Sequence, residues 1–250
     1  MAVARGDADT ADLFRATLLA VALGGGAFIA GAVLFNLVAV LLLGVGVPVL
    51  DPAVRISVST IVLQGVTFLG GSLLYLRLRA DEAPPVSVRT PSRREAGVGL
   101  AGFVLLLGLL VGLQVLFAAF GVSVAESSIL QDGAERPWLL LVLVPASLLL
   151  VGPGEELLFR GLVQGHLREA YSAPAAIGIA SGVFAVTHAG SFTGVGALAS
   201  LAVVFTLALV LGAVYELTGN LLVPILMHGG FNALQYLLEY LSVTGTLPAG

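Results

Sequence analysis

The chain has 250 residues, of which 58% are hydrophobic and only 10% are charged. A soluble domain usually carries about 25% charged residues, so this chain could not cover a surface that faces water. The composition excludes an ordinary soluble enzyme and a disordered chain, and it indicates a protein that crosses a bilayer several times. The net charge of −4 provides no basic field for nucleic acid. With no cysteine, disulfides and Cys-based metal sites are excluded as well.

Runs without Asp, Glu or Arg predict the membrane-spanning helices, because such a helix needs about 20 apolar residues. The runs are 16–50, 56–76, 96–125, 137–154, 170–215 and 217–238. The run 170–215 is long enough for two helices and divides at 190–194. The sequence therefore predicts an all-α transmembrane bundle of about seven helices, or eight if the first run divides near 44–48. We expect one integral membrane domain over 1–250, with N-terminal spans in 1–136.

The distribution of arginine predicts the orientation of the bundle. The segment 77–95 carries five arginines, which favour the cytoplasmic side of a membrane. The segment 126–136 carries three acidic residues and one arginine, which suits the outer side. With seven spans, the N-terminus would be cytoplasmic and the C-terminus external. The expected location is the plasma membrane, as a multi-pass protein.

Three short motifs place ionisable or polar residues within predicted spans, where such residues are costly and mark candidate functional sites. Their members are Glu155, Glu156 and Arg160 after Gly152-Pro153-Gly154, His188 after Phe184, and His228 with Asn232. At a rise of 1.5 Å per residue, Glu155 and His188 lie about 20 Å from the turn near 168–174. His228 and Asn232 lie about 12 and 18 Å from the next turn on that side, and share one helix face.

These depths predict that the polar groups converge, at or below the middle of the bundle on its cytoplasmic side. The prediction requires that the fourth helix continue through 152–154, where the two glycines could open it to water. A carboxylate beside an imidazole can take a proton from water, so that hydroxide attacks a carbonyl. Glu156 and Arg160 are spaced to pair with each other, which leaves Glu155 for chemistry. The motifs contain no Ser, Cys or Asp nucleophile, so direct attack by water on an amide is favoured.

In this order, on successive apolar helices, the three motifs resemble those of the CPBP intramembrane proteases, relatives of the type II CAAX prenyl endopeptidases. The resemblance covers about 151–232 and implies a catalytic core in 137–243. It implies that Glu155 and His188 activate water, that His228 and Asn232 stabilise the oxyanion, and that Glu156 and Arg160 support the site. It also implies a choice between a metal-free mechanism, which we favour, and zinc held by Glu155, His188 and His228.

The expected function is an intramembrane endopeptidase that cleaves a membrane-anchored peptide or protein near the cytoplasmic face, including lipidated CAAX-type substrates. Its expected partners are that substrate and the lipid bilayer, with no nucleic acid. One alternative is a non-catalytic binding, immunity or scaffold protein of the same fold, in which the polar groups only join helices. Another is a small proton-coupled transporter. Outside the motifs, His166 is expected at the membrane interface, and Glu216 is expected to reach water.

Overall fold

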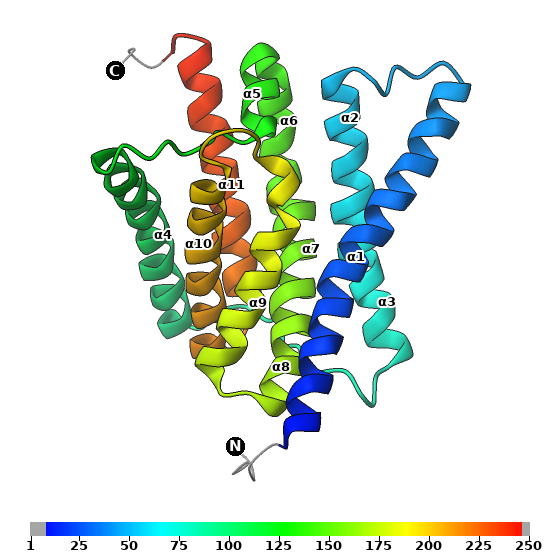
Figure 1. Cartoon of the computed structure of the whole chain (residues 1–250), viewed down its shortest axis with the longest axis vertical. Helices are drawn as coiled ribbons and strands as arrows, with labels where there is room; N and C mark the ends of the chain where they lie inside the picture. The colour runs from blue at the N-terminus through cyan, green and yellow to red at the C-terminus, as the bar shows by residue number, and fades with distance from the viewer. Residues whose placement is uncertain (1–8, 247–250) are drawn as a thin grey trace.

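The computed structural model describes residues 9–246, and all regular structure within them is helical (Figure 1). The helices of the N-terminal half are α1 (Thr10–Gly44), α2 (Pro52–Ser59), η1 (Thr60–Gly70), α3 (Gly71–Leu78), α4 (Arg93–Ala119) and α5 (Ser128–Glu135). Those of the C-terminal half are α6 (Pro137–Ala146), η2 (Ser147–Val151), α7 (Gly152–Glu156), η3 (Leu157–Gln164), α8 (Gly165–Ala170), α9 (Ala173–Thr187), η4 (Ala189–Ser191), α10 (Ala197–Thr218) and α11 (Leu222–Val243). The predicted all-α bundle is confirmed.

Six helices in the described residues are long and apolar enough to cross a membrane. They are Thr10–Gly44, Pro52–Leu78, Arg93–Ala119, Pro137–Ala170, Ala173–Ser191 and Ala197–Thr218. The expected seventh helix is α11, which has 22 residues but is not among the six. Its polar residues, including His228, Asn232 and Gln235, lower its hydropathy. The first run does not divide, because α1 continues unbroken to Gly44.

Two of the spans are single long helices that contain π-helical turns. In Pro52–Leu78 the π-helical segment is η1, and in Pro137–Ala170 the segments are η2 and η3. Pro145 and Pro153 lack a backbone N–H, so they disturb the regular hydrogen-bond ladder on either side of η2. The helix nevertheless continues through 152–154, as the sequence argument required.

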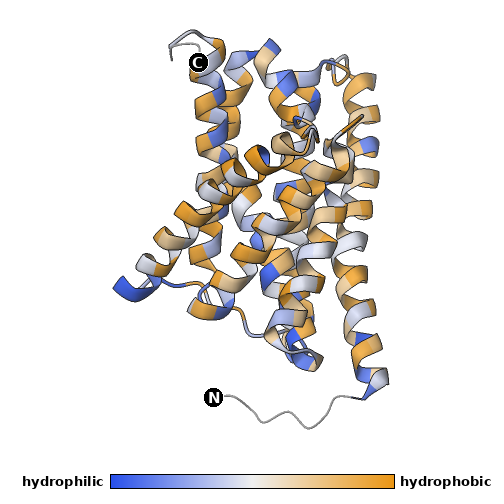
Figure 2. Ribbon diagram, turned by 60° about the vertical axis from the view of Figure 1, so that its left-hand side comes forward, coloured by the Kyte–Doolittle hydropathy of each residue, from blue (hydrophilic) through white to orange (hydrophobic). Residues whose placement is uncertain are grey.

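The C-terminal helices form the centre of the bundle, with α1 to α3 on one side and α4 on the other (Figure 1). The largest core cluster joins η3, α8 and α9, through residues such as Phe159, Leu162 and Phe184. A second cluster joins α4, α10 and α11 around Leu106 and Met227. Apolar residues cover the helices along their length, and many hydrophilic ones lie near helix ends (Figure 2). This is the distribution expected of a protein surrounded by lipid.

One end of the bundle, which we call the arginine-rich end, holds the connection from α3 to α4. There the side-chain amide of Asn220 donates to the Arg89 carbonyl at 2.9 Å, and the Leu221 N–H donates to Ser87. Arg89 pairs with Glu95, and this hydrogen bond raises the pKa of the Arg89 guanidinium above its ordinary value. The turn from α8 to α9 lies at the same end, where Tyr171 contacts the start of α1.

The opposite end gathers the connections α1–α2, α4–α5, α5–α6 and α9–α10 (Figure 1). Two ion pairs join them, Arg55 with Asp132 at 3.2 Å and Arg136 with Asp51 at 3.6 Å. The Ser200 hydroxyl donates to the carbonyl of Ala125 at 2.8 Å. α1 begins at Thr10 at the arginine-rich end. The chain ends to which the orientation prediction refers, 1–8 and 247–250, lie outside the described residues.

Candidate active site

Glu155 lies on α7 in the middle of the bundle and is only 3% exposed. One of its carboxylate oxygens, Oε1, accepts a hydrogen bond of 2.7 Å from the side-chain amide of Gln64 on η1. The other oxygen, Oε2, is buried and has no hydrogen-bond partner within the described residues. A buried carboxylate oxygen without a partner is costly for stability, and such groups are typical of functional sites.

His188 follows the last residue of α9, where it forms the C-terminal cap of that helix. Its Nδ1 lies 2.9 Å from the carbonyl of Phe184, and a carbonyl can only accept, so Nδ1 carries the proton. In the neutral ring, Nε2 is then an acceptor, and it lies 3.9 Å from Glu155 Oε2. Two acceptors face each other across this distance, an arrangement that a bridging hydrogen-bond donor would stabilise.

His228, Glu156 and Arg160 form a buried chain of charged or polar groups behind Glu155. Nδ1 of His228 lies 2.7 Å from Glu156 Oε1, which also accepts a hydrogen bond of 2.9 Å from Arg160. Arg160 donates to the Ala208 carbonyl on α10 and packs over the ring of Phe184. Nε2 of His228 lies 3.7 Å from Glu155 Oε2. The predicted pairing of Glu156 with Arg160 is therefore observed, and it orients His228 toward Glu155.

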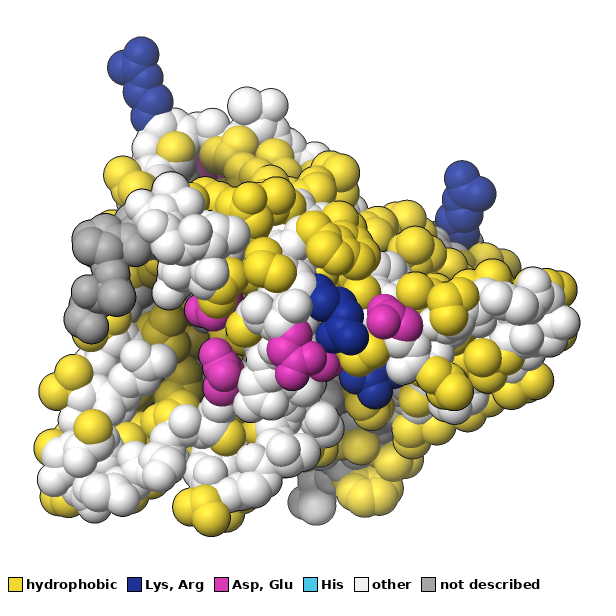
Figure 3. Space-filling model, turned by 90° about the horizontal axis from the view of Figure 1, so that it is seen from above, with side chains coloured by type: hydrophobic (Ala, Val, Ile, Leu, Met, Phe, Trp, Pro, Cys, Tyr) yellow, Lys and Arg dark blue, Asp and Glu magenta, His cyan; other side chains and the backbone are white. Residues whose placement is uncertain are grey.

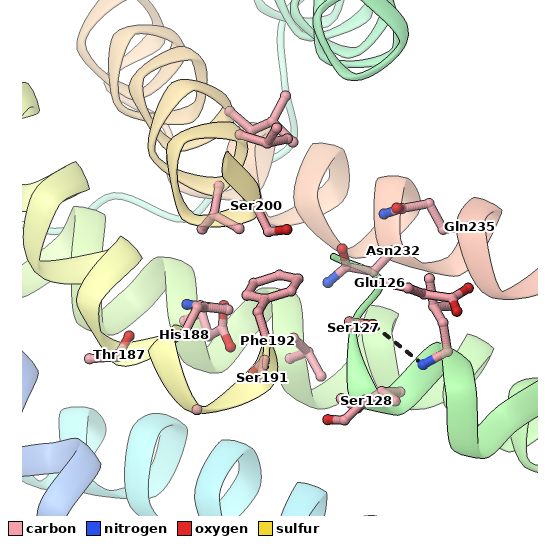
Figure 4. A pocket seen from close by; sticks show the side chains of 18 of the residues that line it. Glu126, Ser127, Ser128, Thr187, His188, Ser191, Phe192, Ser200, Asn232 and Gln235 are labelled. Atoms are coloured by element: carbon pink, nitrogen blue, oxygen red, sulfur yellow. Dashed lines mark hydrogen bonds and ion pairs between the residues drawn. The ribbon is translucent and has the colours of Figure 1, made fainter. Parts of the chain in front are cut away.

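Asn232 lies on α11, one helical turn beyond His228. It lines the same cavity as Glu155, His188 and His228, which has a volume of about 1140 Å³. His188 and Asn232 project into this space from α9 and α11, with Phe192 and Ser200 beside them (Figure 4). The structure thus brings all four residues proposed from the motifs to one cavity, and it places Glu156 and Arg160 behind them.

The cavity opens at the end opposite the arginine-rich end. Its outer wall includes Arg55 on α2, the segment 122–130, Asp132 on α5 and Gln235 on α11. Acidic and basic side chains gather near the middle of this face when it is seen from above (Figure 3). Two expectations are therefore incompatible: the arginine-rich segment and the mouth of the site cannot both lie on the cytoplasmic side.

Sequence reasoning missed Gln64, which is 91 residues from Glu155 along the chain. A signal was present, since Gln64 is the one amide side chain in the charge-free run 56–76. Two other predictions concerned His166 and Glu216. His166 lies on α8 near the arginine-rich end, where it is 3% exposed and forms a hydrogen bond of 2.9 Å with Tyr75. Glu216 pairs with Arg168 at 3.0 Å, and its side chain remains 25% exposed.

The glycines of the first motif permit close packing and do not interrupt the helix. A Cβ on Gly154 would lie 2.6 Å from the carbonyl oxygen of Gln64, and one on Gly152 would lie 2.9 Å from the carbonyl of Ile225. Both distances are shorter than real Cβ contacts allow. Gly154 therefore lets α7 approach η1 closely enough for Gln64 to reach Glu155.

Between residues 9 and 246, no group of three or more His, Asp and Glu side chains is arranged to hold a metal ion. The zinc set Glu155, His188 and His228 does not meet that requirement in this arrangement.

Residues 137–234 match the family described as "Type II CAAX prenyl endopeptidase Rce1-like". No curated protein and no solved structure matched the chain. The recognition made from the three motifs is confirmed over this segment, which is less than half of the chain and contains all six motif residues. The match supports an intramembrane CAAX-type protease as the general function.

Proposed function

We propose that the protein is an intramembrane endopeptidase that hydrolyses a peptide bond of a membrane-associated substrate with water activated by Glu155 and His188. One observation carries this proposal. The Nε2 atoms of His188 and His228 lie 3.9 and 3.7 Å from the same buried oxygen, Glu155 Oε2, at the wall of a large cavity. Structural ion pairing does not require an oxygen without a partner at this point, whereas a water-activating base does.

In the proposed reaction, a water molecule donates hydrogen bonds to Glu155 Oε2 and His188 Nε2. Glu155 takes one proton while the water oxygen forms a bond to the carbonyl carbon of the scissile peptide. The carbonyl π electrons move to its oxygen, giving a tetrahedral oxyanion. The C–N bond then breaks, and the proton held by Glu155 passes to the leaving nitrogen. The side-chain amide of Gln64 donates a hydrogen bond to Oε1 of Glu155, and this bond orients Oε2 toward the water.

His228 and Asn232 are proposed to stabilise the oxyanion, because both line the cavity on one face of α11. Glu155, Glu156 and Arg160 alone carry a net charge of −1 when all three are ionised. A proton on His228 would neutralise this group, with Nδ1–H directed to Glu156. The Nε2–H of the same ring would then be a charged donor, which is stronger than a neutral one. Glu156 and Arg160 act in this account by positioning His228.

The substrate class is a polypeptide held at the membrane, and lipidated CAAX-type tails belong to this class only if the cavity opens to the cytoplasm. No resident cofactor is part of the proposed mechanism, and the alternative zinc centre makes a different prediction. A zinc enzyme loses activity on exhaustive chelation and contains stoichiometric metal after purification. We propose retained activity after chelation. The proposed location is the plasma membrane, with the arginine-rich end in the cytoplasm.

The function is tested with purified protein in lipid nanodiscs and an acyl-anchored or prenylated peptide that carries a fluorophore and a quencher. Glu155→Gln keeps the shape and a hydrogen-bond acceptor but removes the base, so turnover should fall at least about 10³-fold. Glu239→Gln, on the same cavity-forming helix as Asn232 but outside the cavity lining, is the matched control. No cleavage by the unmodified enzyme, or cleavage that survives Glu155→Gln, would contradict the proposal.

A further inference from the structure

We infer that the active-site cavity opens on the extracytoplasmic side, so the substrate is an outer-side segment of a membrane-anchored protein. The inference rests on the proposed function and specifies the substrate class of that same site. It is carried by three separate observations: where the cavity opens, how arginines are distributed between the two ends, and how the bundle is packed between the site and the arginine-rich end.

The lining of the cavity reaches only one end of the bundle. Its outer part is formed by residues of the connections that gather opposite the arginine-rich end, such as Glu126, Ser128, Ser191 and Phe192 (Figure 4). Among the described residues, none from 77–95, 159–171 or 212–222 lines it. These three segments make up most of the arginine-rich end and its approach. The site is therefore reached from the opposite face.

The two ends differ strongly in arginine content. Among the described residues, the arginine-rich end or the helix turns next to it carry Arg15, Arg77, Arg79, Arg89, Arg93, Arg94 and Arg168. The end with the cavity mouth carries Arg55 and Arg136, both in ion pairs with acidic residues. Lysine and arginine counts in short loops set the orientation of membrane proteins, whereas acidic residues contribute little. This asymmetry directs the arginine-rich end to the cytoplasm.

The depth of the site agrees with access from the far side. α9 begins at Ala173 at the arginine-rich end and has 15 residues before His188, a distance of about 22 Å along its axis. The hydrocarbon core is about 30 Å thick, so His188 lies beyond its midplane. Between the site and the arginine-rich end, the bundle is filled by Phe159, Leu162, Val163 and Leu167, each at most 1% exposed. These buried side chains separate the site from the arginine-rich end.

This arrangement excludes tails that remain in the cytoplasm as substrates. A tail that stays in the cytoplasm, whether lipidated or not, would face the closed end of the bundle. A segment that emerges from the bilayer on the outer side, next to a membrane anchor, would face the mouth. Such a segment can reach Glu155 without crossing the membrane.

The absence of cysteine allows a direct test, because single cysteines can be introduced without removing others. Ser128→Cys places a thiol at the cavity mouth, and Ala80→Cys places one at an exposed position of the arginine-rich end. In intact cells, a membrane-impermeant maleimide should label Ser128→Cys and should label Ala80→Cys only after permeabilisation. The reverse pattern, or labelling of both in intact cells, would overturn the inference.

A second measurement separates access from activity. A bulky maleimide on Ser128→Cys should block most cleavage of the anchored peptide by the detergent-solubilised enzyme, whereas the same label on Ala80→Cys should leave cleavage unchanged. Unimpaired cleavage by labelled Ser128→Cys would overturn the assignment of the mouth. If the unmodified enzyme cleaves nothing, the proposed function fails, while the labelling of intact cells still determines the side on which the cavity opens.

Discussion

The helices before residue 120 and those after residue 136 differ in what they bury. Of the 18 residues in the most apolar stretch of α1, 6% are buried within the protein, whereas 44% are buried in the corresponding stretch of α10. The N-terminal helices mainly present apolar side chains outward, as a lipid-facing layer does. The C-terminal helices enclose Glu155, Glu156, Arg160 and His228, each less than 9% exposed. One part of the chain is thus suited to contact with lipid, and the other holds polar groups within the protein interior.

The difference is not a division into two independent units. The N-terminal helices supply part of the cavity wall, through residues such as Phe28, Leu63 and Leu106. They also supply Gln64, which fixes one oxygen of Glu155. We therefore expect substitutions in the C-terminal helices to affect stability and chemistry together. Substitutions at lipid-facing positions of the N-terminal helices should have little effect, unlike those at Gln64 or at buried positions such as Leu106.

The largest effect is expected where a buried charge loses its partner. Arg160→Met leaves Glu156 without its guanidinium, so the free energy of unfolding should fall by about 3–5 kcal/mol. Reversible denaturation in mixed micelles measures this change. The double variant Glu156→Gln/Arg160→Met removes both charges and should recover part of the loss. A loss below about 1 kcal/mol in Arg160→Met would show that Glu156 and Arg160 do not form the buried ion pair described above.

The next effect tests the one polar contribution of the N-terminal helices. Gln64→Leu removes a hydrogen bond to a charged group, worth about 1.5–3 kcal/mol, so kcat should fall about 10- to 150-fold. KM should change little, because Gln64 acts through Glu155. Asn36→Leu on α1 is the control, since within residues 9–246 the Asn36 side chain bonds only to the Ala32 carbonyl of its own helix. Equal activity of the two variants would remove Gln64 from the mechanism.

A third effect tests the close approach between the two regions. Gly154→Ala places a Cβ 2.6 Å from the Gln64 carbonyl oxygen, so α7 and η1 must separate. The expected loss is about 1–3 kcal/mol of stability, with a drop in kcat as Gln64 moves from Glu155. Gly112→Ala on α4 meets no atom within 4 Å and should be neutral or slightly stabilising. The same outcome for both variants would contradict the packing role of Gly154.

The smallest effect is expected on the lipid-facing side of the N-terminal helices. Leu37 on α1 is 58% exposed, so Leu37→Ala should change the free energy of unfolding by less than about 0.5 kcal/mol. Activity in nanodiscs should match that of the unmodified enzyme. A large loss of stability or activity would show that α1 packs more closely than the structure indicates, and the contrast between the two regions would weaken.

Much of the architecture follows from local sequence. Apolar runs predict the helices, because a span needs a minimum length, and the spacing of Glu156 and Arg160 predicts their pairing along one helix. Helix rise places Glu155 and His188 at one level, since both are counted from the same turn. Gln64 and the burial of His166 depend on contacts between distant helices. The end of the bundle at which the cavity opens depends on where the apolar core residues pack. The three motifs do not predict that packing.

The central claim is that Glu155 and His188 act together on one water molecule, and a double-mutant cycle tests it most directly. Turnover of the anchored peptide is measured for the unmodified enzyme, Glu155→Gln, His188→Gln and the double variant. Residues that act as a unit give strongly non-additive effects. We predict that each single variant loses about as much activity as the double variant. Additive losses, or turnover that persists in the double variant, would contradict the account.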